Sequence, residues 1–406
     1  MPIKKSVRMI GRGLRGALRL AGKPVRRRES AGGLVIQPYR GYGTREQIYL
    51  MGRVFRQPQF GKNIADGTLL RDVADVARRL TRWGRGDAKL IARYDGSECR
   101  TTTDKDGYFR VHLHLDQTPP IDRLWHQVEL EVSSRGDRHR EKAEVFIPPA
   151  TARFVVISDI DDTVMYTGVV NKAKMLYRLF VQDADSRVAF PGVGALYRAL
   201  HDGKNGDEQN PMLYVSRAPW SIYEVLERFF QTQQIPLGPV LFLREWGLTL
   251  QRPFPKRASS HKRDLIEDML ARYTELPFIL IGDSGQHDPE VYAKVVAQHP
   301  ERVLAVYIRN VSKPDSRIDE IKKLADEVAR AGSTLVLASD SEAMAKHAAE
   351  HGWIAADRIA EVIADDTDSE LHEDSVEEHS PEGVEKTLSE SEHSEAPPNV
   401  VMEGPG

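Results

Sequence analysis

Two carboxylates separated by one residue, Asp159 and Asp161, follow a short apolar run of the chain, and Thr163 comes two residues later. The run, residues 154–157, is rich in β-branched side chains and ends in a polar turn, which predicts a buried strand. In an open α/β sheet, ligands bind outside the carboxyl ends of the strands. Because neighbouring carboxylates repel one another, a bound cation is the usual reason for such a cluster. Oxygen ligands suit Mg²⁺, so we predict a magnesium site that serves phosphoryl transfer.

A second strand end that carries acids lies more than a hundred residues further along the chain. The apolar residues 278–281 precede Gly282 and Asp283, and Asp288 follows within the same polar segment. Glycine permits the tight turn that this pattern requires. We predict that Asp283 binds the metal ion and that Asp288 lies at or beside it. The structural alternative is a Gly-Asp turn followed by an aspartate that caps a helix.

Two further groups lie between these acid clusters in the sequence. Ser216 ends the apolar run 212–215 and can donate a hydrogen bond to a phosphoryl oxygen, cap the next helix, or do both. Lys262 lies near the start of a predicted helix, where it can neutralise phosphoryl oxygens and Asp159. Because basic residues are abundant around it, a solvated position is the alternative. Taken together, the four segments favour a phosphotransferase site over separate structural roles.

These residues can be assigned to the steps of one reaction. Asp159 leaves its strand first and is the candidate nucleophile, and Asp161 is the candidate general acid and base. Hydrolysis through an aspartyl-phosphate replaces one difficult step by two easier ones. The predicted catalytic residues are Asp159, Asp161 and Lys262, the predicted substrate-binding residues are Thr163, Ser216 and Arg217, and the predicted metal ligands are Asp159, Asp161, Asp283 and Asp288.

Strands and helices alternate from residue 153 onward. This alternation predicts a parallel sheet covered by helices on both faces, and we assign it to a catalytic domain over residues 151–355. The predicted strands are 153–158, 211–216, 239–243, 277–282, 303–308 and 334–338, and the predicted helices lie near 192–202, 219–232, 260–273, 288–298, 317–331 and 341–350.

The region before Pro148-Pro149, residues 33–150, has the pattern of a mostly-β, sandwich-like domain. Apolar and polar residues alternate over 109–115 and 128–132, and shorter strands are predicted at 48–55 and 89–94. One amphipathic helix is predicted over residues 69–80. His112 and His114 are predicted to lie on one outer face of the domain, and solvated side chains are favoured there over a metal site.

Composition limits the class of protein. The 406 residues suffice for two or three domains, and Cys99 is the single cysteine, so neither an intrachain disulfide nor a cysteine-based zinc site is expected. No segment reaches the roughly 18 uninterrupted apolar residues of a membrane-spanning helix. The basic N-terminus lacks the continuous apolar stretch of a secretory signal. We therefore expect a cytoplasmic protein.

The two ends of the chain carry opposite charge, although the net charge is only −3. Residues 1–30 hold ten Lys/Arg and one Glu, with apolar residues at helical spacing. The segment 1–32 is either an amphipathic helix that lies peripherally on an anionic membrane or a disordered basic arm. Residues 365–406 hold fourteen Asp/Glu and one Lys, which predicts a disordered acidic tail. The nearly neutral middle gives no reason to expect a nucleic-acid partner.

Several motifs resemble a known family in order and spacing. They are Asp159–Val164, Tyr214–Trp220, Leu243–Gly247, His261-Lys262 and Gly282–Tyr292. They resemble the haloacid-dehalogenase-like superfamily and, more closely, the catalytic domain of the actin-patch-type phosphatidate phosphatases, as a bacterial member would carry it. The resemblance covers about residues 150–315. It implies a Rossmann-like sheet and magnesium-dependent dephosphorylation of phosphatidate to diacylglycerol, with the residue roles given above.

Neither gap between the motifs has room for a large cap domain. Fewer than fifty residues separate Thr163 from the strand that ends at Ser216, and fewer than fifty separate Ser216 from Lys262. A site with a small cap or none can admit a bulky phosphorylated lipid. Two other functions stay open at this point: a phosphatase for a soluble or protein phosphoester, and a non-catalytic membrane-associated scaffold. The sequence does not reveal an oligomeric state.

Overall fold

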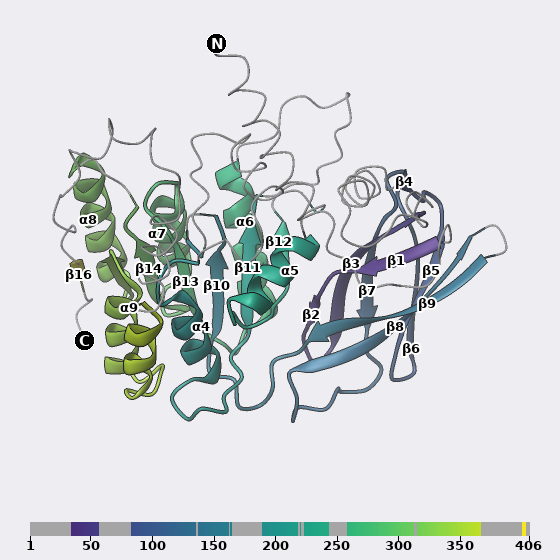
Figure 1. The fold of residues 1–406 in the computed structure, drawn as a ribbon, viewed down its shortest axis with the longest axis horizontal. Helices are drawn as coiled ribbons and strands as arrows, with labels where there is room; N and C mark the ends of the chain where they lie inside the picture. Colours follow the sequence, from purple (N-terminus) through teal and green to yellow (C-terminus); the bar gives the residue numbers. More distant parts are fainter. Residues whose placement is uncertain are drawn as a thin grey trace, which may run out of the picture.

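The computed structural model places the chain in two β-sheets that lie side by side, one of them covered by helices (Figure 1). The structure describes residues 34–56, 83–134, 137–161, 163–164, 189–217, 220, 223–242, 258–311, 315–366 and 400–402. The predicted N-terminal arm over residues 1–32 and the predicted helix over residues 69–80 fall outside the described residues.

The described residues between Leu34 and Phe146 form one mainly antiparallel sheet, and the alternating sequence patterns predicted a mostly-β region here. Its strands are β1 (Leu34–Pro38), β2 (Gly41–Gly43), β3 (Gln47–Arg56), β4 (Trp83–Gly84), β5 (Lys89–Tyr94), β6 (Ser97–Thr102), β7 (Tyr108–His114), β8 (Trp125–Ser134) and β9 (Asp137–Phe146). The main order is β1-β3-β2-β9-β8-β5-β6, and β4 and β7 both pair with β3. The pairing is mainly antiparallel, and β2 with β9 is the parallel exception.

Alternation of side chains builds the core of this domain. In β7, Phe109, Val111 and Leu113 are buried while Arg110 and the two histidines point outward, because successive side chains leave a strand on opposite faces. The buried residues of the other strands join them in one cluster. His112 contacts the ring of Tyr49, and its Nε2 donates a hydrogen bond to Gln47 Oε1 at 2.8 Å. Among the described residues no third metal-ligating group joins the two histidines.

The second sheet has the order β12-β11-β10-β13-β14-β15-β16. Its strands are β10 (Val155–Asp159), β11 (Met212–Ser216), β12 (Val240–Phe242), β13 (Phe278–Asp283), β14 (Val303–Arg309), β15 (Thr334–Ala338) and β16 (Val400–Met402). The strands from β10 to β15 pair in parallel, as predicted. The chain moves from β10 to one side for β11 and β12 and then to the other side for β13. This reversal makes the carboxyl end of β10 a topological switch point.

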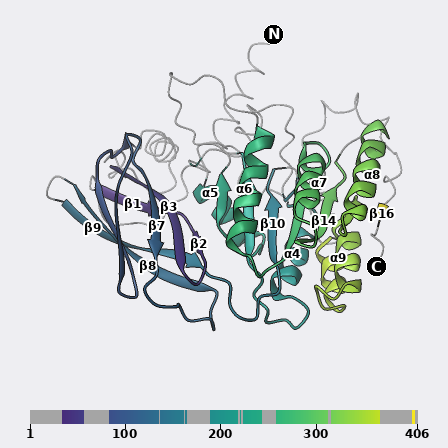
Figure 2. The same cartoon turned by 180° about the vertical axis from the view of Figure 1, so that it is seen from behind.

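Helices cover both faces of this sheet (Figure 1; Figure 2). Val156 and Ile160 face one core with residues of three helices, α4 (Val193–Asp202), α5 (Tyr223–Thr232) and α9 (Ser341–Glu350). Val155 and Ile157 face a second core with residues of α6 (Ala258–Arg272), α7 (Asp288–Gln298) and α8 (Asp315–Arg330). A strand buried on both faces is apolar along its whole length, which is why residues 154–157 show no alternation in the sequence. All six predicted helices of this domain are present, with ends shifted by a few residues.

The catalytic domain extends further toward the C-terminus than predicted. Residues 358–366 are helical, and Val362 is fully buried in the core that contains α4 and α9. The structure also differs from a wholly disordered tail at residues 400–402, which form β16 antiparallel to β15. The reason is a short apolar segment, Val400-Val401-Met402, whose signal is lost when composition is averaged over the acidic tail.

The two sheets meet through aromatic and ionic contacts beside α5. Tyr39 stacks on Trp220 with ring centroids 4.5 Å apart and contacts Tyr223 at 4.6 Å. The backbone N–H of Arg40 donates to the Tyr223 hydroxyl at 2.9 Å, and the Arg40 guanidinium pairs with Glu227. Tyr39 is buried in the hydrophobic core of the catalytic domain, so the two domains share buried surface.

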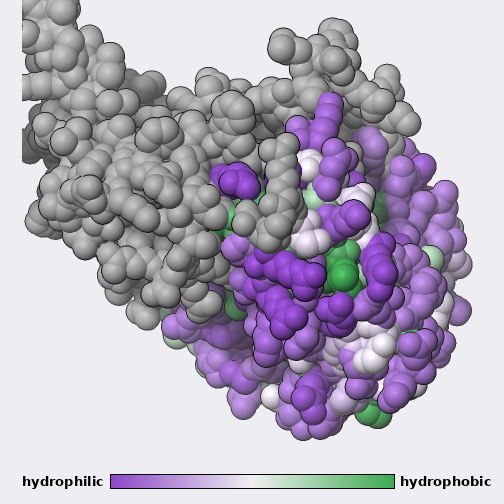
Figure 3. All heavy atoms as spheres, turned by 90° about the vertical axis from the view of Figure 1, so that its right-hand side faces the viewer, coloured by the Kyte–Doolittle hydropathy of each residue, from purple (hydrophilic) through white to green (hydrophobic). Residues whose placement is uncertain are grey.

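The outer end of the β domain is mainly hydrophilic, with a few scattered apolar residues among those that this view displays (Figure 3). Among the described residues, no helix is both long enough and apolar enough to cross a bilayer.

Candidate active site

The carboxyl edge of the parallel sheet collects the predicted site residues. Asp159 ends β10, Ser216 ends β11 and Asp283 ends β13, and all three side chains are buried. Because β10 lies between β11 and β13, these ends are neighbours in space although they are far apart in the sequence. The edge coincides with the switch point of the sheet, where α/β proteins bind their ligands.

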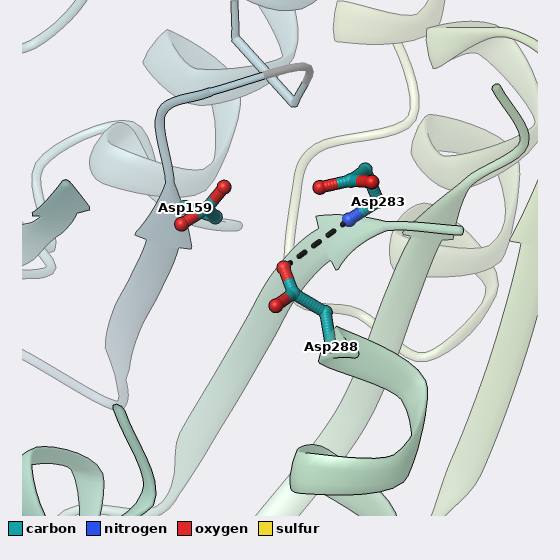
Figure 4. Close-up of side chains that lie close together, drawn as sticks. All are labelled: Asp159, Asp283 and Asp288. Atoms are coloured by element: carbon teal, nitrogen blue, oxygen red, sulfur yellow. Dashed lines mark hydrogen bonds between the residues drawn. The ribbon is translucent and has the colours of Figure 1, made fainter. Parts of the chain in front are cut away.

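Asp159, Asp283 and Asp288 form one buried acidic cluster (Figure 4). Each offers one carboxylate oxygen, and these oxygens all lie within 4.8 Å of one another. Asp288 opens α7, directly after the turn that follows β13, and its Oδ2 accepts a hydrogen bond from the Asp283 N–H at 3.4 Å. The spatial arrangement on which the sequence interpretation depends, acids from distant segments around one point, is therefore present.

Lys262 lies inside this cluster rather than on a solvated face. Its Nζ donates to Asp159 Oδ1 at 2.8 Å and to Asp288 Oδ1 at 2.5 Å, and its side chain is 4% exposed. Nζ also lies 5.6 Å from the centroid of the Tyr292 ring. Burial lowers the pKa of Lys262, but the two carboxylates outweigh burial, so its pKa is raised above the ordinary value. The lysine therefore stays charged and compensates part of the acidic charge.

The electrostatics of Asp159 favour a further positive charge at this point. Burial, helped by Asp288 and Asp161, raises the pKa of Asp159 to about 8, although Lys262 opposes the shift. Asp159 Oδ2 is buried and has no hydrogen-bond partner among the described residues. An all-oxygen donor set with one such orphaned oxygen fits a hard divalent cation, which would stabilise the ionised carboxylate.

Asp161 and Thr163 follow Asp159 in the chain, and Arg217 follows Ser216. Asp161 is buried, and its Oδ2 accepts a hydrogen bond from the Arg217 N–H at 3.4 Å. Its carboxylate is not among the three that form the acidic cluster, so its assignment as a ligand stays a prediction. Thr163 is 1% exposed, and its Oγ1 has no hydrogen-bond partner among the described residues. A buried hydroxyl without a partner costs free energy, which fits a donor kept for a ligand.

The turn after β13 is built for close approach. A Cβ at Gly282 would lie 2.4 Å from Asp288 Oδ2 and 2.8 Å from the Tyr292 ring. Glycine at this position therefore lets α7 bring Asp288 to the cluster. Gln286 in the same turn donates its backbone N–H to Asp283 Oδ1 at 2.9 Å, which orients that carboxylate.

Three residues at or near the site carry no role in the sequence interpretation. Gln286 lies within the Gly282–Tyr292 motif, and its position between Asp283 and Asp288 could have indicated that it lies at the site. Arg317, on α8, donates to the Ser284 and Gln286 carbonyls. Tyr39 supports the segment after Ser216 from the other domain. Nothing local distinguishes Arg317 from the many other basic helix residues, or Tyr39 from other strand-end aromatics.

The described residues thus form an α/β domain with a buried cluster of three carboxylates whose oxygens fit a cation. Residues 154–310 match the family described as phosphatidate phosphatase APP1, catalytic domain. This match agrees with the resemblance that the motifs show over about residues 150–315.

Two fungal proteins show the similarity directly. Phosphatidate phosphatase APP1 of Saccharomyces cerevisiae is 34% identical over 224 residues, covering 53% of this chain and 35% of that protein. An uncharacterized protein of Schizosaccharomyces pombe is 28% identical over 227 residues, covering 55% of this chain and 36% of that protein. The match thus takes in about a third of each fungal protein.

Solved structures add nothing to this assignment. A carbohydrate acetylesterase from Xanthomonas citri is 10% identical, with 74% of this chain and 75% of that chain covered, but its TM-score of 0.26 is too low to bear on fold or function.

Proposed function

We propose that the protein is a magnesium-dependent phosphatase of the haloacid-dehalogenase-like type that converts phosphatidate to diacylglycerol and phosphate. The observation that carries this proposal is the convergence of Asp159, Asp283 and Asp288 on one point, with Lys262 bonded to two of them. The family match over residues 154–310 supports the phosphatase class and the choice of phosphatidate.

The metal ion would be held by the carboxylates of Asp159, Asp283 and Asp288. Bound Mg²⁺ would supply positive charge for the phosphoryl oxygens and for the nucleophile. Lys262 adds a second, permanent charge on the same side of Asp159. Thr163 and Ser216, both of which are buried, would donate hydrogen bonds to the phosphoryl group.

The reaction proceeds in two steps that use two carboxylates. The Asp159 carboxylate attacks phosphorus and forms an aspartyl-phosphate, while Asp161 gives its proton to the departing alkoxide oxygen of diacylglycerol. Asp161, now ionised, takes a proton from a water molecule, whose oxygen displaces phosphate from Asp159. Both carboxylates thus return to their starting states.

The membrane-held substrate suggests where the protein works. The short gaps between motifs support a site with a small cap or none. We propose a cytoplasmic protein that reaches anionic membranes peripherally through its basic residues 1–30. Replacing Arg12, Arg15 and Arg19 by Gln should weaken co-sedimentation with phosphatidylserine vesicles at low salt, because fewer charges face the surface. Unchanged co-sedimentation would rule out this arm as the contact.

Phosphate release from phosphatidate in detergent micelles tests the function. The wild type with Mg²⁺ should release phosphate, and Asp159→Asn and excess chelator should each abolish release. Asp264→Asn is the matched control, because Asp264 is an exposed carboxylate on α6, close in sequence to Lys262. Persistent release by Asp159→Asn would refute the mechanism. Higher rates on a sugar phosphate or a phosphopeptide would refute the lipid substrate and keep the phosphatase class.

A further inference from the structure

Gln286 connects the two acid-bearing loops of the site. Its side-chain Nε2 donates to the backbone carbonyl of Asp161 at 3.1 Å, across 125 positions of sequence. Its backbone N–H donates to Asp283 Oδ1 at 2.9 Å. The residue is 9% exposed, so both hydrogen bonds are shielded from water, where such contacts hold geometry firmly.

The amide group of Gln286 is not explained by packing alone. Its Oε1 is buried and has no hydrogen-bond partner among the described residues, which costs free energy that an apolar side chain would avoid. Exchanging the amide oxygen and nitrogen would set two oxygens against each other at the Asp161 carbonyl. The donor Nε2 is therefore the part of the side chain that this position requires.

Gln286 is itself held in place from outside the loop. Arg317 donates from Nη2 to the Gln286 carbonyl at 2.7 Å and from Nε to the Ser284 carbonyl at 3.0 Å. The same guanidinium pairs with Glu290, where its Nη2 lies 3.0 Å from Oε2. A chain of contacts thus runs from α8 through the turn after β13 to the peptide of Asp161.

We infer that Gln286 is a positioning residue for Asp161, and that its amide sets the reach of that carboxylate toward the leaving oxygen. The Asp161 carboxylate also accepts a hydrogen bond from the Arg217 N–H at 3.4 Å. Gln286 touches neither substrate nor reacting atom and acts through the Asp161 peptide. This inference rests on the proposed function, in which Asp161 is the general acid.

The dependence on the leaving group tests this inference. An alkyl phosphate has a poor leaving group that needs a proton, whereas a p-nitrophenyl phosphate leaves with little help. Because general acid catalysis contributes about 10²- to 10⁴-fold, Gln286→Met should lower kcat/KM for the alkyl ester about tenfold to a hundredfold. For the aryl ester the loss should stay below about threefold, and KM should change little for either. Equal losses on both esters, or no loss, would overturn the inference.

A double-mutant cycle provides a second, independent readout. If Gln286 acts through Asp161, adding Gln286→Met to Asp161→Asn should change the alkyl-ester rate little beyond the loss that Asp161→Asn causes. If the loss in the double variant equals the product of the two single-variant losses, the inference is contradicted. Gln286→Glu keeps the shape of the side chain and lacks the donor, so it replaces Gln286→Met in both assays should the Met variant fail to fold.

The two assays also separate this inference from the proposed function. Activity on neither ester by the wild type, or full activity of Asp159→Asn, removes the proposed function and the inference together. A wild type that hydrolyses both esters but not phosphatidate changes only the substrate. An active wild type with equal losses in Gln286→Met removes the inference alone.

Discussion

Lys262 is the residue on which the buried charges of the site depend. It neutralises part of three carboxylates that burial would otherwise penalise, and its own charge survives only because Asp159 and Asp288 lie within hydrogen-bonding distance. A buried ion pair adds little net stability compared with apolar residues, but removal of one partner leaves an uncompensated charge. The lysine therefore balances the buried charge of these acids, in addition to its proposed catalytic role.

Lys262→Met should lower the free energy of unfolding by about 3–5 kcal/mol in the absence of metal, because Asp159 and Asp288 lose their common partner. Urea unfolding in the presence of a chelator measures this. Arg263→Met is the control, since Arg263 pairs with Glu267 on the helix surface and such pairs contribute below about 1 kcal/mol. Added Mg²⁺ should restore part of the loss in Lys262→Met. Equal stability of the two variants would show that Lys262 does not balance the cluster.

Each loop at the carboxyl edge is held by an element other than the strand that it follows. The turn after β13 is tied to α8 through Arg317, and the Asp161 loop is tied to that turn through Gln286. Such ties matter because short loops at strand ends have few contacts of their own, while catalysis needs their side chains in fixed places. The helices of this domain therefore order the site as well as cover the sheet.

Arg317→Met should reduce stability by roughly 1–3 kcal/mol, since the partly buried guanidinium donates to two carbonyls and to Glu290. Phosphate release should fall as well, because the turn that carries Asp283 loses its outer support. Arg330→Met on the same helix is the matched control, as Arg330 is exposed and bonds only locally to the Asp326 carbonyl. Urea midpoints and phosphate release measured on the two variants decide the point. Equal urea midpoints and equal phosphate release in the two variants would show that Arg317 does not support the turn after β13.

The two domains form one folded unit at the side of α5. Tyr39 enters the core of the catalytic domain and stacks on Trp220, which itself contacts Phe242 of β12 at 4.2 Å. Trp220 lies four positions after Ser216, so the β domain contacts the catalytic domain close in sequence to this predicted substrate-binding residue. Separate domains joined by a linker would not share buried aromatic surface in this way.

Tyr39→Ala should destabilise the protein by about 3–5 kcal/mol, because a large buried ring is removed between the domains. Tyr39→Phe keeps the stacked ring and should lose less than about 1 kcal/mol. Unfolding followed by tryptophan fluorescence and by far-UV circular dichroism should give coincident transitions in the wild type, as expected for one cooperative unit. If the two transitions separate in Tyr39→Ala, the domains stabilise each other through this contact. If they still coincide at the wild-type midpoint, the contact does not contribute to stability.

The order of strands and helices in residues 151–355 could be predicted from the sequence, because buried parallel strands and amphipathic helices have distinct local patterns. The site could be predicted in large part for the same reason. Asp159, Ser216 and Asp283 each follow an apolar strand, and the ends of parallel strands share one edge. The β domain was harder to predict, since strands such as β6 and β9 carry many charged residues and obtain their place by pairing with neighbours.

The sequence by itself determined that Asp159, Ser216 and Asp283 lie at the ends of apolar strands of one parallel sheet, and it predicted a chemical role for each. Only the tertiary structure decided that Lys262 is buried between Asp159 and Asp288, that Gln286 reaches the Asp161 peptide, and that Tyr39 enters the other domain. The physical reason is that periodicity reports whether a side chain is buried, whereas the identity of its partner depends on which distant elements pack together. Contacts across many positions of sequence leave no local pattern.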